Sequence, residues 1–431
     1  MARWVTWRFV INRELLLTRT AFLCPSHGRT CIVSLPVDAG TNPRSRRAFG
    51  QPWFRHPRSH LFDARFCCGR LAPMVFGLLL AAAIASSTPC TVGSPDCTEW
   101  IRPAGQPSRL LIYRNYPLDQ KNDNITRALI FVHGINRDGD NHFRTALAAA
   151  FLADCLNNTV IVAPRFASNS SVPGNQAGDC RDALAGDEAN WVCETQRADT
   201  WRFGDGEVGN DKLTSFDFMN EIVRRLARKQ VFPNLRNIVV AGHSAGGQFV
   251  IRYEMANQVH DSVSIPISYV VSNAAAYPYI DEMRPTSTAM PKTVSAAAPG
   301  FQPIGPTVPP PPFVPFADAK NCVGFDRWAY GLKNKLGYAS RLTEDELTKQ
   351  LVARPTTYLL GEVDILPLGI FDTTCPAMAQ GPTRLARGLA FSRYANDRNG
   401  ASHKAVVVPF CGHSARCIFT SDVALPLIFP D

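Results

Sequence analysis

Lysine is absent from the first 73 residues of this 431-residue chain, and acidic residues are scarce there. The segment holds 12 Arg against three acids, Glu14, Asp38 and Asp63, so the formal net charge of +9 lies within it. Residues 74–431 carry 33 basic and 33 acidic side chains. A remainder without net charge offers no electrostatic reason to expect a nucleic-acid partner, and we predict none.

Long apolar runs are also missing. The run within Met74–Ser87 is shorter than the about 20 residues that span a bilayer, so no stable membrane anchor is expected. Its length and its small final residues are typical of a signal peptide cleaved near Ser86–Cys90. Residues 1–73 are then either an Arg-rich presequence for an organelle or an over-extended gene model with Met74 as the true start. We favour the second interpretation, since a signal inside a chain is hard to use, and predict a secreted protein.

Cysteine spacing and sequons agree with export. Nine cysteines follow Met74, and three pairs are close in sequence, as disulfides in an oxidising compartment often are: Cys90/Cys97, Cys180/Cys193 and Cys411/Cys417. The odd number predicts at least one free thiol. Asn-x-Ser/Thr sequons begin at Asn124, Asn157 and Asn169, so we expect a glycoprotein.

Short aliphatic runs alternate with helical patterns from about Arg109 onward, which predicts an α/β domain over 88–431. The central sheet should be mostly parallel, with helices on both faces, because the runs are near-continuously apolar. The predicted strands are Leu110–Tyr113, Ala128–Val132, Val160–Ala163, Ile238–Ala241, Tyr269–Ser272, Thr357–Leu360 and Ala405–Val408. Predicted helices are Phe143–Leu156, Gln248–Val259 and one capped by Ser215 that buries Met219, Ile222, Val223 and Leu226.

Two long segments interrupt this alternation. Ser168–Asn210 is rich in Gly, Asp and Asn and contains Trp191 and Trp201, and Asp281–Asp318 contains Pro309–Pro312. Loops of this length are uncommon in a compact domain unless they shape a site. We interpret both as insertions that either form a lid or wall of a substrate cleft or are surface excursions.

The motif Gly242-His243-Ser244-Ala245-Gly246 lies between a predicted strand and a predicted helix. A Gly-x-Ser-x-Gly in this context is typical of a nucleophile elbow, a turn so tight that glycines must flank the strained serine. The following helix N-terminus favours negative charge beside the serine. Ser244 is the predicted nucleophile.

A serine hydroxyl needs a base to take its proton, and the partners of such an elbow follow in the order acid, then histidine. His413 follows the last predicted strand at its carboxyl end, where catalytic loops gather. His260 and His403 are less suitable, since the first ends a helix and the second precedes the strand. Asp364 follows the preceding strand and is the predicted acid, with Glu362 and Asp372 in reserve.

An oxyanion needs two backbone donors. The amide of Ala245 directly after the nucleophile is one, and the amide of Ile135 in Val132-His133-Gly134-Ile135-Asn136 is the other. Gly134 would let the backbone approach closely, and His133 is predicted to brace the loop. Cys411, His413 and Cys417 lack a fourth ligand, so no metal site is predicted.

The chain resembles the α/β-hydrolase superfamily of serine hydrolases over roughly Arg109–Phe429. More narrowly, it is similar to microbial α/β-hydrolases labelled polyhydroxybutyrate-depolymerase-like. The stretches that carry this likeness are Val132–Asn136, Ala241–Phe249 with Arg252-Tyr253, Phe325–Gly331, Tyr358–Asp364 and Cys411–His413. The resemblance implies the α/β-hydrolase fold, the triad Ser244, Asp364 and His413, and no cofactor.

The expected function is hydrolysis of an ester-type acyl bond, in a small-molecule or polymeric substrate, through an acyl-enzyme on Ser244. An amidase, thioesterase or acyltransferase would use the same residues, and fold alone does not distinguish them. The alternative from another class is a catalytically silent protein of this fold that acts in binding or adhesion.

Overall fold

The computed structural model describes residues 88–171, 180–193, 200–286, 312–366 and 371–431. The Arg-rich segment 1–73, the apolar segment 74–87 and Pro309–Pro311 lie outside the described residues. Among the residues that are described, no helix is long and apolar enough to cross a membrane.

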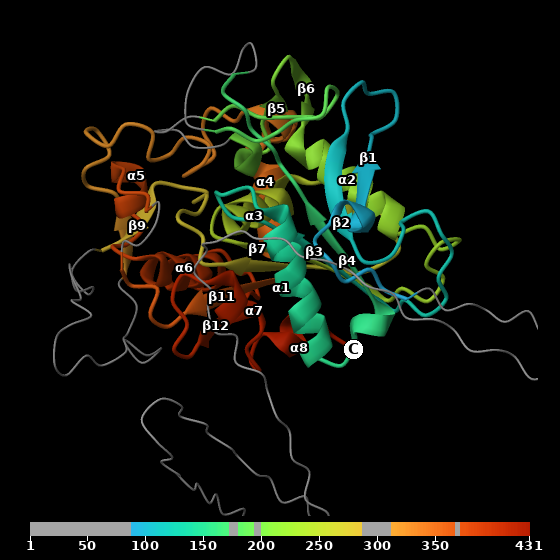
Figure 1. Ribbon diagram of the computed structural model, residues 1–431. Coiled ribbons are helices and arrows are strands. Elements are labelled where there is room, and N and C mark those ends of the chain that lie inside the picture. The colour runs from blue at the N-terminus through green and yellow to red at the C-terminus, as the bar shows by residue number, and fades with distance from the viewer. Residues whose placement is uncertain (1–87, 172–179, 194–199, 287–311, 367–370) are drawn as a thin grey trace, which may run out of the picture. The chain divides into compact units, whose positions relative to one another are not determined.

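Eight described strands form the main sheet in the spatial order β1-β2-β4-β3-β7-β8-β11-β12 (Figure 1). The pairs β1–β2 and β2–β4 are antiparallel, and every other neighbouring pair is parallel. The strands are β1 (Thr98–Ile101), β2 (Leu110–Arg114), β3 (Arg127–Val132), β4 (Thr159–Pro164), β7 (Asn237–His243), β8 (Ile267–Ser272), β11 (Thr356–Gly361) and β12 (Lys404–Val408).

All seven predicted strands are confirmed, each lengthened by one to three residues. The sequence prediction missed β1, an edge strand in which only Ile101 is fully buried. Such a strand lacks the continuous apolar pattern by which the buried strands were predicted. The mostly parallel α/β architecture is as expected.

Helices cover both faces of this sheet (Figure 1). Helix α1 (Gly139–Leu152) lies beside α7 (Ala415–Phe419) and α8 (Leu425–Ile428), and their apolar residues share one buried cluster with β3 residues Leu129 and Phe131. Alternate β3 residues, Ile130 and Val132, face the opposite cluster, because successive side chains of a strand point to opposite sides. The second layer comprises α2 (Ser215–Leu226), α3 (Ala245–Ala256), α4 (Glu344–Ala353) and α6 (Arg384–Arg393). The short α5 (Cys375–Met378) lies between β11 and α6 in the chain.

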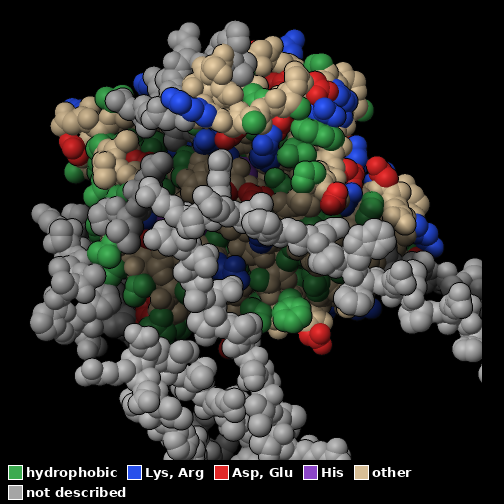
Figure 2. Space-filling model, in the orientation of Figure 1, with side chains coloured by type: hydrophobic (Ala, Val, Ile, Leu, Met, Phe, Trp, Pro, Cys, Tyr) green, Lys and Arg blue, Asp and Glu red, His purple; other side chains and the backbone are tan. Residues whose placement is uncertain are grey.

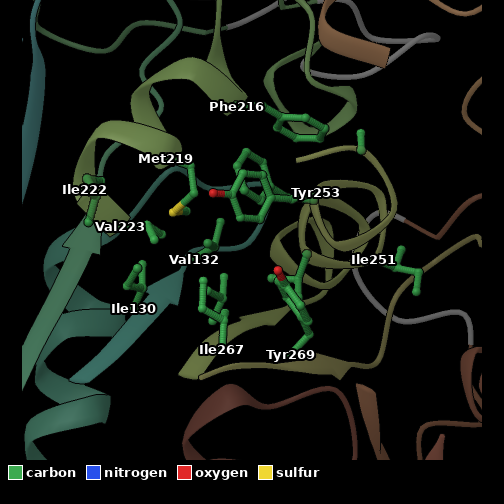
Figure 3. Close-up of a cluster of buried hydrophobic side chains, with 14 of the residues drawn as sticks. Ile130, Val132, Phe216, Met219, Ile222, Val223, Ile251, Tyr253, Ile267 and Tyr269 are labelled. Atoms are coloured by element: carbon green, nitrogen blue, oxygen red, sulfur yellow. The ribbon is translucent and has the colours of Figure 1, made fainter. Parts of the chain in front are cut away.

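Helix α2 was predicted from an apolar stripe and a capping residue in the sequence. The predicted apolar stripe Met219, Ile222, Val223 and Leu226 is buried, and Figure 3 shows its first three members facing side chains of β3 and β8. Burying side chains of this size stabilises the fold by about 1.5–3 kcal/mol each. The predicted cap is wrong by one residue: Thr214, not Ser215, accepts from the Asp217 amide and completes a capping box. The helices predicted at Phe143–Leu156 and Gln248–Val259 begin and end three to four residues earlier than expected.

Each inserted segment contributes at least one strand to a small antiparallel sheet besides its loops. In the first, β5 (Gly206–Glu207) pairs with β6 (Asn210–Thr214), and in the second, β9 (Met283–Pro285) pairs with β10 (Phe313–Pro315). Trp191 and Trp201 of the first insertion are fully buried in the core. These described parts therefore contribute to the packed interior as well as to the surface.

Four disulfides join described residues. The three predicted pairs, Cys90–Cys97, Cys180–Cys193 and Cys411–Cys417, are present. A fourth, Cys322–Cys375, was missed because 53 residues separate its partners. Cys155 is the free cysteine among the described residues, in agreement with the odd count.

Side chains of both charge signs are interspersed on the face of the molecule shown in Figure 2. This mixture fits the balanced charge of residues 74–431.

Candidate active site

Ser244 occupies a strained turn between β7 and α3. Its φ of 59° and ψ of −116° are unusual for a residue other than glycine. Such backbone strain at a serine between a strand and a helix is typical of a nucleophile elbow, in which the tight turn exposes the hydroxyl. The Ser244 amide donates to Ser272 O at the end of β8, which fastens the turn to the sheet.

The flanking glycines are required by close backbone approach. A Cβ on Gly242 would come within 3.0 Å of the Gly246 backbone, and one on Gly246 would overlap Val132 O and His133 O. Gly247 is similarly close to Ser272 O. Larger residues at these positions would push α3 away from β3 and β8.

His413 and Asp364 lie beside this turn, as their positions after β12 and β11 predict. His413 Nε2 is 2.9 Å from Ser244 Oγ, and His413 Nδ1 is 2.8 Å from Asp364 Oδ2. Asp364 is buried, and the His413 side chain is 18% exposed. Three side chains more than 40 residues apart in sequence thus form one hydrogen-bonded chain.

The order of these elements along the chain identifies the fold. Within the main sheet, the strained serine follows the fifth strand in chain order, Asp364 follows the seventh, and His413 follows the eighth. The two helix layers and the antiparallel β1–β2 edge complete the pattern. The chain has the α/β-hydrolase fold.

Several solved structures are similar to the chain at low sequence identity. Poly(aspartic acid) hydrolase-1 from Sphingomonas sp. KT-1 is 20% identical, with a TM-score of 0.48 over 77% of this chain and 97% of that one. A poly(3-hydroxybutyrate) depolymerase from Bordetella parapertussis is 20% identical, with a TM-score of 0.46 over 75% and 85%. An esterase from Pseudomonas putida ECU1011 is 12% identical, with a TM-score of 0.36 over 77% and 79%. No protein-family model matches the chain, and no curated protein matches it.

The segments that carry the two predicted oxyanion donors both lie next to Ser244. The Ala245 amide is the first of α3, and a Cβ on Gly134 would be 3.8 Å from Ser244 Cβ, which places the Ile135 loop next to the serine. Among the described residues, neither the Ala245 nor the Ile135 amide donates a hydrogen bond. Both donors are therefore available to a ligand.

The loop's peptide orientation is set by Gly134 O. This oxygen accepts from His133 Nδ1 at 2.8 Å and from the Arg137 amide at 3.2 Å. Because the trans peptide is planar, fixing Gly134 O also fixes the opposite direction of the Ile135 N–H. The predicted bracing role of His133 agrees with this geometry.

His133 is held as the neutral Nδ1–H tautomer. Its Nε2 accepts from the Phe166 amide at 2.9 Å, so Nδ1 carries the proton that Gly134 O receives. Burial lowers the pKa of His133 to about 4, because water is excluded from the charged form. The ring also packs edge-on against Trp201 of the first insertion at 4.7 Å.

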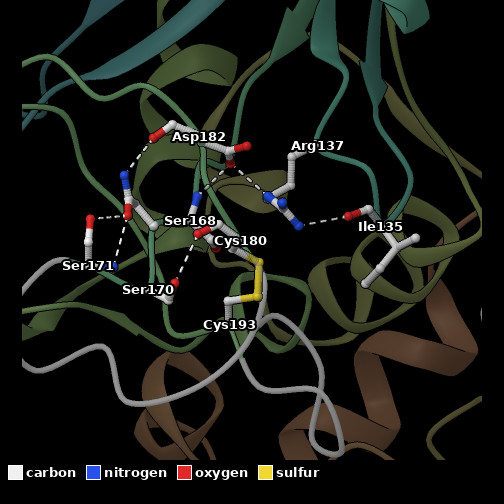
Figure 4. The surroundings of a disulfide bond; sticks show 9 residues. Ile135, Arg137, Ser168, Ser170, Ser171, Cys180, Asp182 and Cys193 are labelled. Carbon is white, nitrogen blue, oxygen red and sulfur yellow. Dashed lines mark hydrogen bonds and ion pairs between the residues drawn. A yellow bond between two sulfur atoms is a disulfide. The ribbon is translucent and has the colours of Figure 1, made fainter.

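A polar network of Arg137, Asp182 and Ser168 holds the same loop (Figure 4). Arg137, itself at φ 58°, donates from Nε to Asp182 Oδ2 at 2.6 Å and from Nη1 to Ile135 O at 2.9 Å. The Ser168 amide also donates to Asp182 Oδ2, at 2.8 Å. Asp182 lies two residues after Cys180, whose disulfide to Cys193 closes this part of the insertion. Sequence reasoning missed this network because its partners are 45 residues apart.

The reserve acids lie elsewhere. Glu362 Oε2 accepts from the Phe410 amide at 2.8 Å and so secures the loop that carries His413. Asp372 accepts from Tyr330 Oη at 2.7 Å. Among the three acids considered, Asp364 is the one hydrogen-bonded to His413.

The other histidines that follow Ser244 have structural contacts. His260 Nδ1 is 2.9 Å from Tyr269 Oη, and its amide donates to Asn257 Oδ1. His403 lies between Tyr358 Oη and Leu351 O, at 2.9 Å and 2.8 Å.

Two further residues at the site were not predicted. The His243 ring packs against the His413 ring at a tilt, with centroids 4.6 Å apart, and burial holds the pKa of His243 well below the ordinary range. Arg384, at the start of α6, reaches Asp364 Oδ1 with Nη1 at 3.4 Å. An arginine 20 residues after the acid has no sequence signal that links it to the site.

The sulfurs of Cys411 and Cys417 are joined to each other and so are not arranged as metal ligands around His413. In the described part of the chain, no group of three or more His, Cys, Asp or Glu side chains could hold a metal ion.

Proposed function

We propose that this chain is a serine hydrolase that cleaves ester bonds, with Ser244 as nucleophile, His413 as general base and Asp364 as the acid that orients it. The observation that carries the proposal is the continuous hydrogen-bonded chain Ser244 Oγ–His413–Asp364 at 2.9 Å and 2.8 Å. Both distances are within the reach that a nucleophile–base pair and a base–orienting pair need.

In the proposed reaction, Ser244 Oγ attacks the ester carbonyl while His413 Nε2 takes its proton. The amides of Ala245 and Ile135 donate to the oxyanion of the tetrahedral intermediate. His413 then gives the proton to the departing alcohol oxygen, which leaves an acyl-serine ester. A water molecule, deprotonated by His413, attacks this ester, and the carboxylic acid leaves as Ser244 regains its proton.

Asp364 accepts from His413 Nδ1–H and thereby keeps Nε2 free to act as the base. It also stabilises the imidazolium that forms during each step. Esters are the preferred class because an alkoxide is a better leaving group than an amine anion. Small-molecule and polymeric esters both remain within this class.

The direct test is hydrolysis of p-nitrophenyl esters of graded acyl length by the wild type and by Ser244→Ala, His413→Gln and Asp364→Asn. Each single substitution should lower kcat by about 10⁴-fold or more while the circular dichroism spectrum is unchanged. Ser262→Ala is the matched control, since that serine is exposed and donates only to Val259 O. A Ser244→Ala variant as active as the wild type would refute the proposal, and wild-type inactivity on every ester would favour the binding-protein alternative.

We further propose that the protein is exported. Four disulfides among the described residues support an oxidising compartment, because cytosolic thiols are kept reduced. If Met74 is the start, N-terminal sequencing of secreted material should begin near Ser86–Cys90. Recovery of mature protein that retains part of 1–73 would favour the organelle presequence instead.

A further inference from the structure

Asp364 has two carboxylate oxygens, and each faces a different partner. Oδ2 accepts from His413, whereas Oδ1 faces Arg384 Nη1 at 3.4 Å. The side chains of Asp364 and Arg384 are 2% and 1% exposed, so this ion pair is almost completely removed from water. A buried pair of opposite charges interacts much more strongly than an exposed one.

Burial of the positive charge of Arg384 at the start of a helix would be energetically unfavourable without Asp364. Arg384 is the first residue of α6, where the helix macrodipole disfavours a positive charge. Burial adds a desolvation cost, and it lowers the pKa of Arg384. The guanidinium lies over the Phe371 ring at 5.0 Å, which adds a cation–π attraction but no opposite charge. Asp364 is the acidic side chain that offsets both costs.

Backbone hydrogen bonds fix the positions of Asp364 and Arg384 relative to each other. The Leu385 amide donates to Asp364 O at 3.3 Å, and Thr383 caps α6 through the Ala386 amide. The helix start is therefore tied to the same loop that carries the acid. Movement of Arg384 away from Asp364 would require α6 or this loop to shift.

We propose that Arg384 is a positioning residue of the active site: it orients the Asp364 carboxylate toward His413 and offsets part of its negative charge. This inference rests on the proposed serine hydrolase function. Without Arg384, the full charge of Asp364 would act on His413 alone and would favour the imidazolium, which cannot accept the Ser244 proton. The enzyme would then lose activity at a higher pH as conditions become acidic.

Other titratable groups face this cluster and must be considered. His243 of β7 packs against His413, and Tyr277, after β8, is close enough to Asp364 for their charges to interact. Burial lowers the pKa of His243 and raises that of Tyr277, so both are neutral near pH 7. Glu362 lies in the acid's own loop, and Asp372 lies near Arg387 of α6. Arg384 is the charged group that directly contacts Asp364.

Arg387 provides a matched control one helical turn away. It is also buried in α6 and lies over the same Phe371 ring, at 4.5 Å. Its guanidinium donates to the backbone oxygens of Ala275, Gly381 and Asp372. Arg387→Met therefore removes a buried arginine from the same helix without removing the partner of the acid.

The test is the pH dependence of kcat/KM for p-nitrophenyl ester hydrolysis by the wild type, Arg384→Met, Arg384→Gln, Arg384→Lys and Arg387→Met. Both neutral variants at 384 should lower kcat by about 10- to 100-fold with little change in KM, because the base is misplaced. Their acidic limb should move up by about one pH unit, since removal of a nearby positive charge has this scale of effect on the protonation of a histidine. Arg384→Lys keeps the charge and should retain the wild-type limb despite a lower kcat.

The histidine ring resonances, measured by NMR and assigned with His413→Gln, give a readout that does not need turnover. His413 should titrate at higher pH in Arg384→Gln than in the wild type. An unchanged acidic limb and an unchanged His413 titration in both neutral variants would overturn the proposal, as would an equal shift in Arg387→Met. A wild type that hydrolyses no ester would instead refute the proposed function, and the NMR titration would still test the effect of Arg384.

Discussion

Arg137 Nε lies 2.6 Å from Asp182 Oδ2, and this pair connects the loop that carries the Ile135 amide to the disulfide-closed insertion. The arginine also donates to Ile135 O, and its own amide donates to Gly134 O. Arg137 thereby holds the carbonyl groups of both Gly134 and Ile135 in the predicted oxyanion loop, and Figure 4 shows the bond to Ile135 O.

Asp182→Asn should lower kcat for ester hydrolysis by about 10-fold with a small change in KM. This is less than the 10²- to 10³-fold cost of removing an oxyanion donor, because the Ile135 amide stays present but is held less firmly. Steady-state kinetics with a p-nitrophenyl ester checks the effect. Asp187→Asn is the control, since Asp187 pairs with Arg102 and Arg109 at the surface. A change in KM alone, or an equal loss of kcat in both variants, would contradict a role in transition-state binding.

Gly246→Ala should strongly reduce activity and destabilise the fold. Its methyl group would overlap Val132 O and His133 O, so α3 or the oxyanion loop must move. We expect kcat to fall by about 100-fold or more from misplacement of the reacting groups, and the free energy of unfolding to fall by about 1–3 kcal/mol from overpacking. Gly186→Ala, where a Cβ meets open space, should change neither quantity. Urea unfolding and ester kinetics measure both, and a fully active Gly246→Ala would be inconsistent with the close packing.

Glu254→Gln should remove part of the pH dependence of stability. Both carboxylate oxygens of Glu254 are buried without a hydrogen-bond partner among the described residues, and burial raises its pKa well above the ordinary range. The folded state therefore keeps a proton that the unfolded chain releases above about pH 4.3, so stability is lost as pH rises. As pH rises, the free energy of unfolding should fall more steeply in the wild type than in Glu254→Gln. The two slopes should differ by up to about 1.4 kcal/mol per pH unit. Urea titrations from pH 5 to 8, about the usual stable range, measure this difference, and parallel curves would contradict it.

Glycosylation should discriminate among the three sequons. Asn124 and Asn157 are exposed, whereas Asn169 Nδ2 donates to Asp182 O at 2.8 Å and its Oδ1 accepts from the Ser171 amide and hydroxyl. After secretion from a yeast host, peptide mass spectrometry should find glycans at Asn124 and Asn157 and an unmodified Asn169. Full occupancy at Asn169 would show that its folded contacts do not protect it.

The fold and the positions of Ser244, Asp364 and His413 were predictable because their signals are local. A strand, a glycine-flanked serine and a helix follow one another directly, and the acid and histidine each follow a strand whose apolar run is evident. Chain order then places all three at the same edge of the sheet. Their roles in catalysis remain a proposal that the kinetic variants test.

Arg384, His243 and the Arg137–Asp182 pair were not predictable for a different reason. Each acts through a contact made only after folding, and a single arginine or aspartate carries no pattern that names its partner. The Cys322–Cys375 disulfide is another such contact, since pairings across 53 residues cannot be read from spacing. Thr214 and Ser215 are adjacent residues that both favour a helix cap, and only the Asp217 hydrogen bonds distinguish them.

The most direct measurement is the location of a fluorophosphonate adduct by tandem mass spectrometry of the wild-type protein. The account predicts one adduct per chain, on the peptide that contains Ser244, and no adduct in a folded Ser244→Ala variant. Equal labelling of both proteins, or an adduct on another serine, would contradict the assignment of Ser244 as the nucleophile.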